Sequence, residues 1–190
     1  PTANHSYYAT LENTTHFYQI VQGDLPVKLL MQNLLNQTSV CFDTETTGID
    51  ALNAELVGMS FSFEKGKGFY VPFPENQEEA QTLIEKFRPF FENENIEKIG
   101  QNMKYDLKIL SNYNIQVKGK LFDTMIAHYL INPDMRHNMD VLSETYLKYA
   151  PKSIFLVIFL FLFYFFLFYF YFFYFYVFYF INNFNITNHI

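Results

Sequence analysis

The clearest pattern in the chain is a strict alternation of residue types between positions 57 and 63. Large apolar side chains occupy the odd positions and glycine or serine the even ones, the period of two that a half-buried strand shows. The apolar run "SVCFD" (39–43) predicts a buried strand before it. After a glycine-containing turn, "FYVPF" (69–73) predicts an antiparallel partner, so that the two later segments form a hairpin. Pro72 places this partner at a sheet edge or at its own end.

Apolar residues at helical spacing mark the remaining elements. Residues 26–35, introduced by Asp24, predict one helix. Asn76 followed by Glu79 forms a capping box for another helix, which ends near Pro89. Further helices are predicted over 101–113, after a short strand at 96–100, and along two apolar stripes: Phe122, Met125, Ile126, Tyr129 and Leu130, and then Met139, Leu142 and Tyr146.

The order of these elements predicts an α/β fold. Antiparallel strands come first and strand-helix alternation follows, which indicates a mixed sheet flanked by helices. A length of 190 residues suits one domain of ordinary size. We divide the chain into an N-terminal lead-in and helix (1–34), a globular domain (35–154) and an aberrant aromatic tail (155–190).

The tail differs from the rest of the chain. Residues 155–181 contain only Phe, Tyr, Leu, Val and Ile, and a run of about 20 apolar residues is long enough to span a bilayer. Its tyrosines are scattered instead of gathering at the two ends, which argues against a membrane helix. Phe, Tyr, Leu, Ile and Asn, which make up most of this tail and its flank, can all be encoded by codons of A and T alone. The tail is therefore interpreted as a frameshift product, with a membrane anchor and an aggregation-prone tail as alternatives.

Charge and cysteine content narrow the functional classes. A net charge of −6 excludes a basic DNA-coating protein, so contact with nucleic acid requires a local basic patch or bound cations. The single cysteine, Cys41, lies in an apolar run and fits a buried thiol in a reducing compartment. The chain begins at Pro1 without a secretory signal, and we expect a fragment of a cytoplasmic protein, membrane-associated only if the tail spans a bilayer.

Asp106 is out of place in an apolar helix face. On a helical wheel of residues 103–110, at about 100° per residue, it falls within the apolar arc, whereas Lys104 and Lys108 lie opposite. A carboxylate that faces the core needs a hydrogen bond, an ion pair or a metal ion. Asp106 is thus either a hydrogen-bonded core residue or a ligand.

Asp43 and Glu45 raise the same question at the end of the 39–43 strand. Residues two apart on a strand share a face, so their charges repel unless something offsets them. A divalent cation would do so, and carboxylate oxygens suit Mg²⁺ or Mn²⁺. Two solvated acids in a turn are the alternative, because one D-x-E pattern is weak evidence.

Three segments together are more specific. "CFDTETTGIDALNAELVGMSFSF", "KIGQNMKYDLKIL" and "LFDTMIAHYLINPDMRHNMDVLSETYL" occur in this order. They resemble the 3′-5′ exonuclease (proofreading) domain of bacterial DNA polymerase I, one of the DnaQ-like four-carboxylate exonucleases with a ribonuclease H-like fold. The resemblance covers roughly residues 35–154. It matches Asp43 and Glu45 to the first exonuclease motif and Asp106 to the second.

The resemblance implies phosphodiester hydrolysis assisted by two divalent metal ions, Mg²⁺ or Mn²⁺. Asp43 would bridge both ions, Glu45 would bind the first and Asp106 the second. The implied partners are the 3′ end of single-stranded DNA and a polymerase domain in the intact parent chain. The positions that match substrate-facing residues of the family are Ile49, Gln101, Asn102, Lys104, Tyr105 and Arg136.

Four other polar residues receive structural interpretations. Asp123 and Asp140 are expected to cap helices or lie in their first turns. His128 falls opposite the 122–130 apolar stripe and is expected to be solvated. His137 is expected to support its neighbour Arg136.

One part of the family pattern is missing. The family has a third motif, Tyr-x-x-x-Asp, on a later helix, and this chain has no Asp or Glu after Glu144. Without the fourth carboxylate and its tyrosine, hydrolysis is expected to be impaired. The alternatives are a catalytically dead nucleic-acid-binding module and a membrane-anchored protein with an exonuclease-like head.

Overall fold

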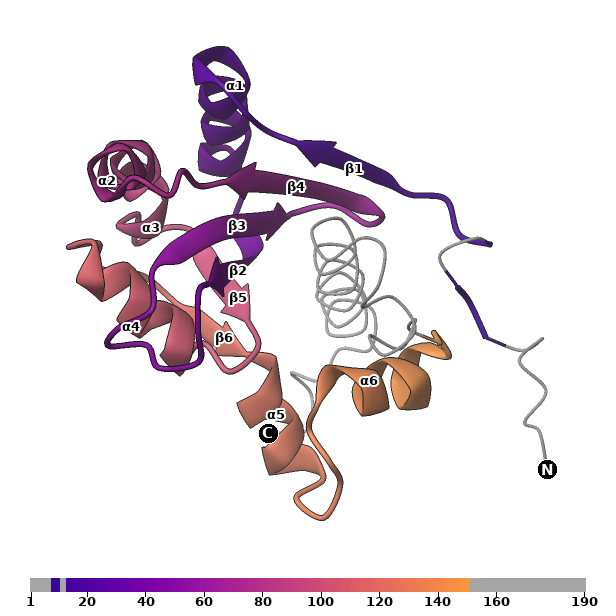
Figure 1. The fold of residues 1–190 in the computed structure, drawn as a ribbon. Coiled ribbons are helices and arrows are strands. Elements are labelled where there is room, and N and C mark those ends of the chain that lie inside the picture. The colour runs from indigo at the N-terminus through magenta and orange to yellow at the C-terminus, as the bar shows by residue number, and fades with distance from the viewer. Residues whose placement is uncertain (1–7, 11–12, 151–190) are drawn as a thin grey trace.

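A six-stranded mixed sheet organises the computed structural model, which describes residues 8–10 and 13–150 (Figure 1). The strand order is β1-β4-β3-β2-β5-β6. β2, β3 and β4 are antiparallel, whereas β1 pairs parallel with β4, and β5 pairs parallel with both β2 and β6. The strands are β1 (Phe17–Ile20), β2 (Ser39–Thr46), β3 (Leu56–Ser62), β4 (Lys67–Pro72), β5 (Glu97–Gly100) and β6 (Leu121–Asp123).

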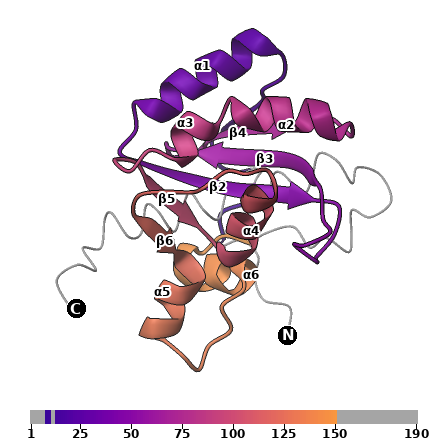
Figure 2. The same ribbon diagram turned by 90° about the vertical axis from the view of Figure 1, so that its left-hand side faces the viewer.

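Most helices lie on one side of this sheet. Figures 1 and 2 show α1, α2, α3 and α4 covering one face, with α6 on the other side. This arrangement confirms the predicted mixed sheet flanked by helices. The helices are α1 (Asp24–Leu35), α2 (Gln77–Glu85), α3 (Arg88–Phe91), α4 (Lys104–Asn112), α5 (Thr124–Ile131) and α6 (Met139–Leu142), followed by a π-helical turn, η2 (Ser143–Leu147).

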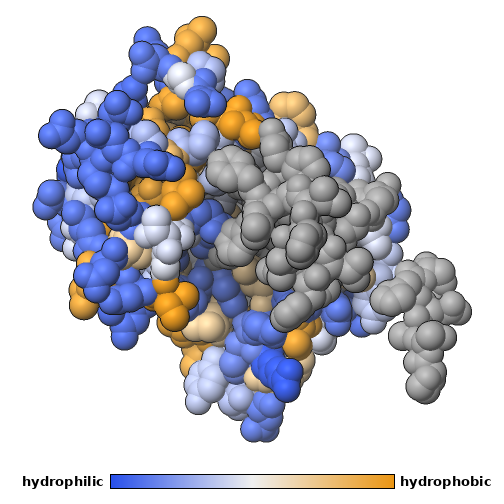
Figure 3. Space-filling model, viewed as in Figure 1, coloured by the Kyte–Doolittle hydropathy of each residue, from blue (hydrophilic) through white to orange (hydrophobic). Residues whose placement is uncertain are grey.

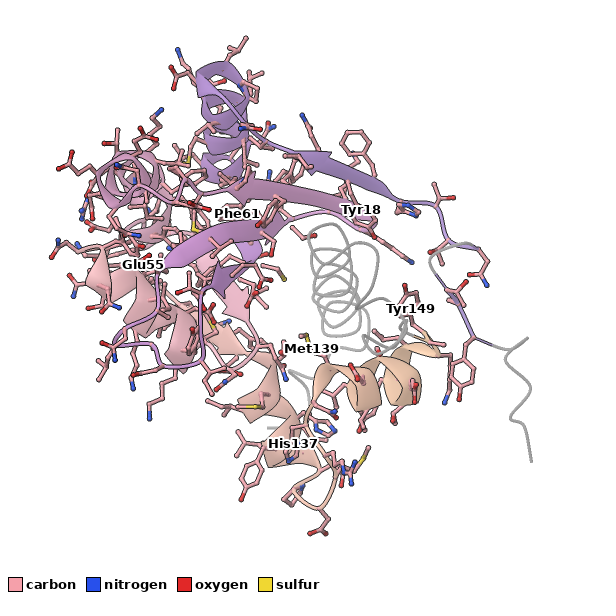
Figure 4. All side chains as sticks on the ribbon, viewed as in Figure 1. Tyr18, Glu55, Phe61, His137, Met139 and Tyr149 are labelled. Atoms are coloured by element: carbon pink, nitrogen blue, oxygen red, sulfur yellow. The ribbon has the colours of Figure 1, made fainter. Side chains whose placement is uncertain are left out.

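An aromatic core fills the space between the sheet and α3. Phe61, labelled in Figure 4, stacks on Phe87 with ring centroids 5.3 Å apart and meets Phe90 edge-on at 5.8 Å. Phe42 of β2 meets Phe91 edge-on at 5.2 Å. Because side chains alternate along a strand, the odd residues of β2, including Asp43, point away from this core. The core therefore anchors β2 and leaves its acidic face available.

The structure confirms the predicted hairpin of β3 and β4. β4 ends at Pro72 as expected, but it is not an edge strand, because β1 pairs with it. The Asn76 side chain caps α2 by accepting from the backbone N–H groups of Glu78 and Glu79. β1 and all but the last residue of α1 lie in the 1–34 lead-in, so this segment contributes to the sheet and the core. The boundary at residue 34 stays a prediction.

The predicted buried stripe of α5 is wrong. Ile126 is 56% exposed and Leu130 75% exposed, whereas His128, expected in solvent, is only 8% exposed. α5 directs its polar side toward the segment around His137 and leaves its apolar side over a groove of about 730 Å³ beside α4. Over the described residues, the surface seen in Figure 3 is mainly hydrophilic with separate hydrophobic patches.

No helix within residues 8–10 and 13–150 has the length and apolar character needed to cross a membrane. The aromatic segment 155–181, to which the membrane and frameshift interpretations apply, lies outside the described residues.

Candidate active site

Asp43 and Glu45 lie where β2 extends beyond its neighbour β5. The parallel pairing of these strands covers only Ser39 to Cys41 of β2, opposite Glu97 to Ile99. On its other side β2 stays paired, with Asp43 opposite Ser60 and Glu45 opposite Gly58 in β3. The two carboxylates therefore project from a strand that is held by β3 and open on the β5 side.

Asp106 occupies that open side. It lies in the first turn of α4 and is 3% exposed, which confirms that its position on the wheel faces inward. Its Oδ1 accepts hydrogen bonds from the Thr44 backbone N–H at 2.9 Å and from Thr44 Oγ1 at 2.6 Å. The carboxylate thus satisfies a β2 amide that no longer has a strand partner. α4 and β2 are therefore joined through one acid of the candidate site, Asp106.

Burial and neighbouring carboxylates raise the free-energy cost of ionising the three acids. Asp43 is 5% exposed, and burial, followed by the charges of Asp106 and Glu45, raises its pKa well above the ordinary value. Burial and the Asp106 charge raise the pKa of Glu45 to about 8. Burial raises the pKa of Asp106 to about 6, although the Thr44 hydrogen bonds oppose that rise. Within the part of the chain that the structure describes, no cationic side chain lowers the pKa of any of these three acids.

Two carboxylate oxygens here are buried and unpaired. Within the described residues, Asp43 Oδ2 and Glu45 Oε1 have no hydrogen-bond partner. Buried acceptors without donors are costly, and a hard divalent cation would satisfy oxygens of this kind. The donor chemistry therefore fits Mg²⁺ or Mn²⁺.

The same residues do not form a complete ion cage. In the part of the chain that the structure describes, no group of three or more His, Cys, Asp and Glu side chains is arranged to hold an ion by itself. The Asp106 Oδ1 atom is already occupied by Thr44. A bound ion would need further oxygens, and Mg²⁺ commonly takes these from water and substrate phosphate.

Tyr105 fastens the loop that follows Glu45. Its hydroxyl donates to the Gly48 carbonyl at 2.5 Å and lies 2.5 Å from Thr46 Oγ1. The adjacent Ile49 side chain is 98% exposed. The structure thus brings Tyr105 and Ile49 to the same side of the site, with Tyr105 holding the loop and Ile49 open to a partner.

Gln101 and Asn102 are engaged in structural contacts. Gln101 is 9% exposed, and its Nε2 donates to the His137 carbonyl at 2.8 Å. Asn102 has a positive φ of 57°, and its backbone N–H donates to Asp123 at 3.1 Å. Lys104 and Arg136 are exposed, so their side chains are accessible to an anionic ligand.

Asp123 and Asp140 have the structural positions that were expected. Asp123 is the N-cap of α5 and also accepts from the backbone N–H of Met103 at 2.8 Å, so one carboxylate serves the starts of both α4 and α5. Asp140 lies in the first turn of α6. Neither carboxylate is among the three at the end of β2.

The sequence did not predict a cluster of two histidines and a tyrosine that the structure contains. His128 Nδ1 lies 2.6 Å from His137 Nδ1, and His128 Nε2 lies 3.0 Å from the Tyr146 hydroxyl. Burial, and then the neighbouring His137, lowers the pKa of His128. Figure 4 shows His137 in the segment that leads to α6. Its side chain contacts His128, and the periodicity of α5 carried no signal for this contact.

The sheet order, the helices on both sides and the acids at the end of β2 define the ribonuclease H-like class of nuclease folds. Solved structures agree: the catalytic core of RRP6 from Trypanosoma brucei superimposes with a TM-score of 0.62 at 22% identity, covering 78% of this chain and 39% of that one. NrnC of Brucella melitensis, solved with bound Mg²⁺, gives a TM-score of 0.57 at 20% identity and covers 74% and 65%. These likenesses concern the fold.

Sequence comparison then identifies the family. A family profile described as 3′-5′ exonuclease matches residues 18–155, and the chain belongs to this family, as the exonuclease domain of DNA polymerase I. It is 35% identical to DNA polymerase I of Borreliella burgdorferi over 141 residues, which are 73% of this chain and 15% of that protein. The Pseudomonas aeruginosa enzyme is 32% identical over 142 residues, 70% and 16% of the two chains. The chain therefore spans about one sixth of these relatives.

Proposed function

We propose that Asp43, Glu45 and Asp106 bind two divalent cations, Mg²⁺ or Mn²⁺, in a 3′-5′ exonuclease site for the 3′ end of single-stranded DNA. The observation that carries this proposal is the pair of buried, unpaired oxygens, Asp43 Oδ2 and Glu45 Oε1, beside a third buried carboxylate. NrnC, which shares the fold, has been solved with Mg²⁺ and with pGG, and this supports a metal-assisted site on such a sheet.

Each acid has a distinct part in this proposal. Bound ions would supply an activated water and stabilise the leaving 3′ oxygen. Asp43, central on β2, would contact both ions, with Glu45 and Asp106 each serving one. Thr44 donates two hydrogen bonds to Asp106 Oδ1 and thereby fixes the orientation of this carboxylate. Outer hydrogen bonds of this kind fix the direction of a metal-binding carboxylate.

The substrate-facing residues divide into direct and indirect groups. Lys104 and Arg136 are exposed and would bind phosphate oxygens. Ile49, almost wholly exposed, would pack on a terminal base. Tyr105, Gln101 and Asn102 would act by holding the loop after Glu45 and the start of α4.

Hydrolysis by this 190-residue sequence is proposed to be weak. No acid follows Glu144, so neither a fourth carboxylate nor the tyrosine of a Tyr-x-x-x-Asp motif is present to orient the attacking water. Orientation of the reacting groups accounts for a large share of a catalysed barrier. The exposed Lys104 and Arg136 favour a second candidate, a module that binds nucleic acid without cleaving it.

Metal titration tests the proposal. Isothermal titration of the chain with Mn²⁺ should show binding that Asp43→Ala weakens at least tenfold, because that change removes the central carboxylate. Asp140→Ala is the matched control, since Asp140 is an exposed first-turn acid and its loss should leave the affinity unchanged. Equal affinities for wild type and Asp43→Ala would refute the metal site.

A cleavage assay separates the two candidates. The proposal predicts slow, Mn²⁺-dependent trimming of end-labelled single-stranded DNA that Asp106→Ala abolishes. Retention of DNA without trimming would instead support the binding module. The membrane-anchored alternative concerns residues 155–181, and it stays a prediction.

A further inference from the structure

Tyr70 of β4 lies on the same face of the sheet as the carboxylates. Asp43 pairs with Ser60 of β3, and Ser60 pairs in turn with Tyr70. Directly paired residues on neighbouring strands point to the same side of a sheet. Tyr70 is therefore two strands away from Asp43 on the acidic face.

The Tyr70 ring lies across Gly58. A Cβ atom placed on Gly58 would lie 2.1 Å from the Tyr70 hydroxyl oxygen and 2.4 Å from two of its ring carbons. Gly58 is the residue directly opposite Glu45. Because position 58 has no side chain, the phenol of Tyr70 extends over β3 toward Glu45.

The chemistry of the two groups is complementary. Tyr70 is 6% exposed, and a phenol keeps its proton at neutral pH because its ordinary pKa is about 10. Within the described residues, Glu45 Oε1 is a buried acceptor without a hydrogen-bond partner. A protonated phenol and an unsatisfied carboxylate therefore face one small space above Gly58.

We propose that Tyr70 is a positioning residue for Glu45: its hydroxyl donates a hydrogen bond to the Glu45 carboxylate when a divalent cation is bound. This inference rests on the proposed metal site. A glutamate side chain has three rotatable bonds, and a fixed donor reduces the conformational freedom lost when it binds an ion. Gly58 would be required at its position because any side chain there would displace the phenol.

A double-mutant cycle on Mn²⁺ affinity tests the role. Isothermal titration is performed on wild type, Tyr70→Phe, Glu45→Gln and the double variant of the 190-residue chain. Tyr70→Phe should weaken Mn²⁺ binding about tenfold, the lower end of the effects known for such outer residues. In the Glu45→Gln background the same change should have almost no effect, because the group that Tyr70 positions is then no longer an anionic ligand.

Tyr113→Phe is the matched control. Tyr113 is also buried, but its hydroxyl bonds the Leu56 backbone N–H at 2.9 Å and Gln77 at 3.1 Å, on the helix-covered side of the sheet. Its loss should lower the melting temperature without changing Mn²⁺ affinity. This pattern separates a general loss of stability from a local effect on Glu45.

The outcomes distinguish this inference from the proposed function. Mn²⁺ binding that depends on Asp43 but is the same in wild type and Tyr70→Phe overturns the Tyr70 role alone. An equal loss in the wild-type and Glu45→Gln backgrounds also overturns it, since Tyr70 would then act through another group. Absence of any Asp43-dependent binding overturns both proposals.

Discussion

Individual residues explain why the acidic site could be located in advance. Asp106 interrupted an apolar arc and Asp43 and Glu45 shared a strand face, and such contradictions between residue type and position are visible in a sequence. The partner of Asp106 was not visible, because Thr44 is 62 positions away and only the end of β5 exposes its amide. Tyr70 was equally hidden, since its place over Gly58 depends on the register of three strands.

The raised pKa values of the acids predict an unusual dependence of stability on pH. A carboxyl group whose pKa is higher in the folded state binds more protons there, so the free energy of unfolding falls as pH rises. Without metal, the protein should be more stable at pH 5 than at pH 8, because folding raises the pKa of Glu45 from 4.5 to about 8. Urea denaturation at both values measures this.

Substitution tests the source of that dependence. At pH 8 without metal, Glu45→Gln should stabilise the fold by about 1–3 kcal/mol, because each unit of pKa shift corresponds to about 1.4 kcal/mol and partial solvation reduces the sum. Asp50→Asn is the control with the opposite sign: hydrogen bonds from Leu52 and Asn53 lower the pKa of Asp50, so its loss should not stabilise. A destabilising Glu45→Gln would contradict the electrostatic account.

At the scale of elements, the long periodic segments and the short strand β5 were predictable, whereas the strands β1 and β6 were not. β3 and α2 followed from alternation and from the Asn76 cap. β1 and β6 have four and three residues, too few to show a period. α5 was predicted as a helix, but its buried side was misassigned because His128 finds partners in His137 and Tyr146. The hydrogen bonds of His128, and not the apolar residues of α5, therefore accompany the buried side of this helix.

The exposed side of α5 predicts tolerance to charge. Leu130 is 75% exposed, so Leu130→Glu should change the free energy of unfolding by less than about 0.5 kcal/mol. Leu110, which is fully buried in the neighbouring α4, is the control, and Leu110→Ala should cost about 2–5 kcal/mol. Urea denaturation compares the two. A large cost for Leu130→Glu would mean that this side of α5 is covered in solution.

The molecule as a whole is an acidic protein, with 19 Asp and Glu against 13 Lys and Arg. The net charge of −6 is visible in the sequence, and so is the family, because its motifs are local. How β1 joins the sheet beside β4 could not be predicted, since parallel pairing links distant segments. The matched residues correspond to about 15% of DNA polymerase I of Borreliella burgdorferi, so most of that relative lies outside the matched domain.

This charge distribution predicts a weak salt dependence of DNA binding. If Lys104 and Arg136 are the main phosphate contacts, the logarithm of the affinity for single-stranded DNA should fall with the logarithm of salt concentration with a slope of about −1.4, at about −0.7 per contact. Lys104→Ala should reduce the slope to about −0.7, whereas Lys28→Ala, exposed on α1, should leave it unchanged. Fluorescence anisotropy at several salt concentrations measures both, and identical slopes in all variants would exclude Lys104 as a contact.

The bond between Thr44 and Asp106 has a consequence for folding order. Because it joins a strand to a helix 62 residues later, no fragment that ends before α4 can hold the third carboxylate in place. The site therefore assembles only after long-range contacts have closed. The Thr44 amide should exchange its hydrogen only when α4 separates from the sheet, so its exchange rate would report directly on the opening of the site.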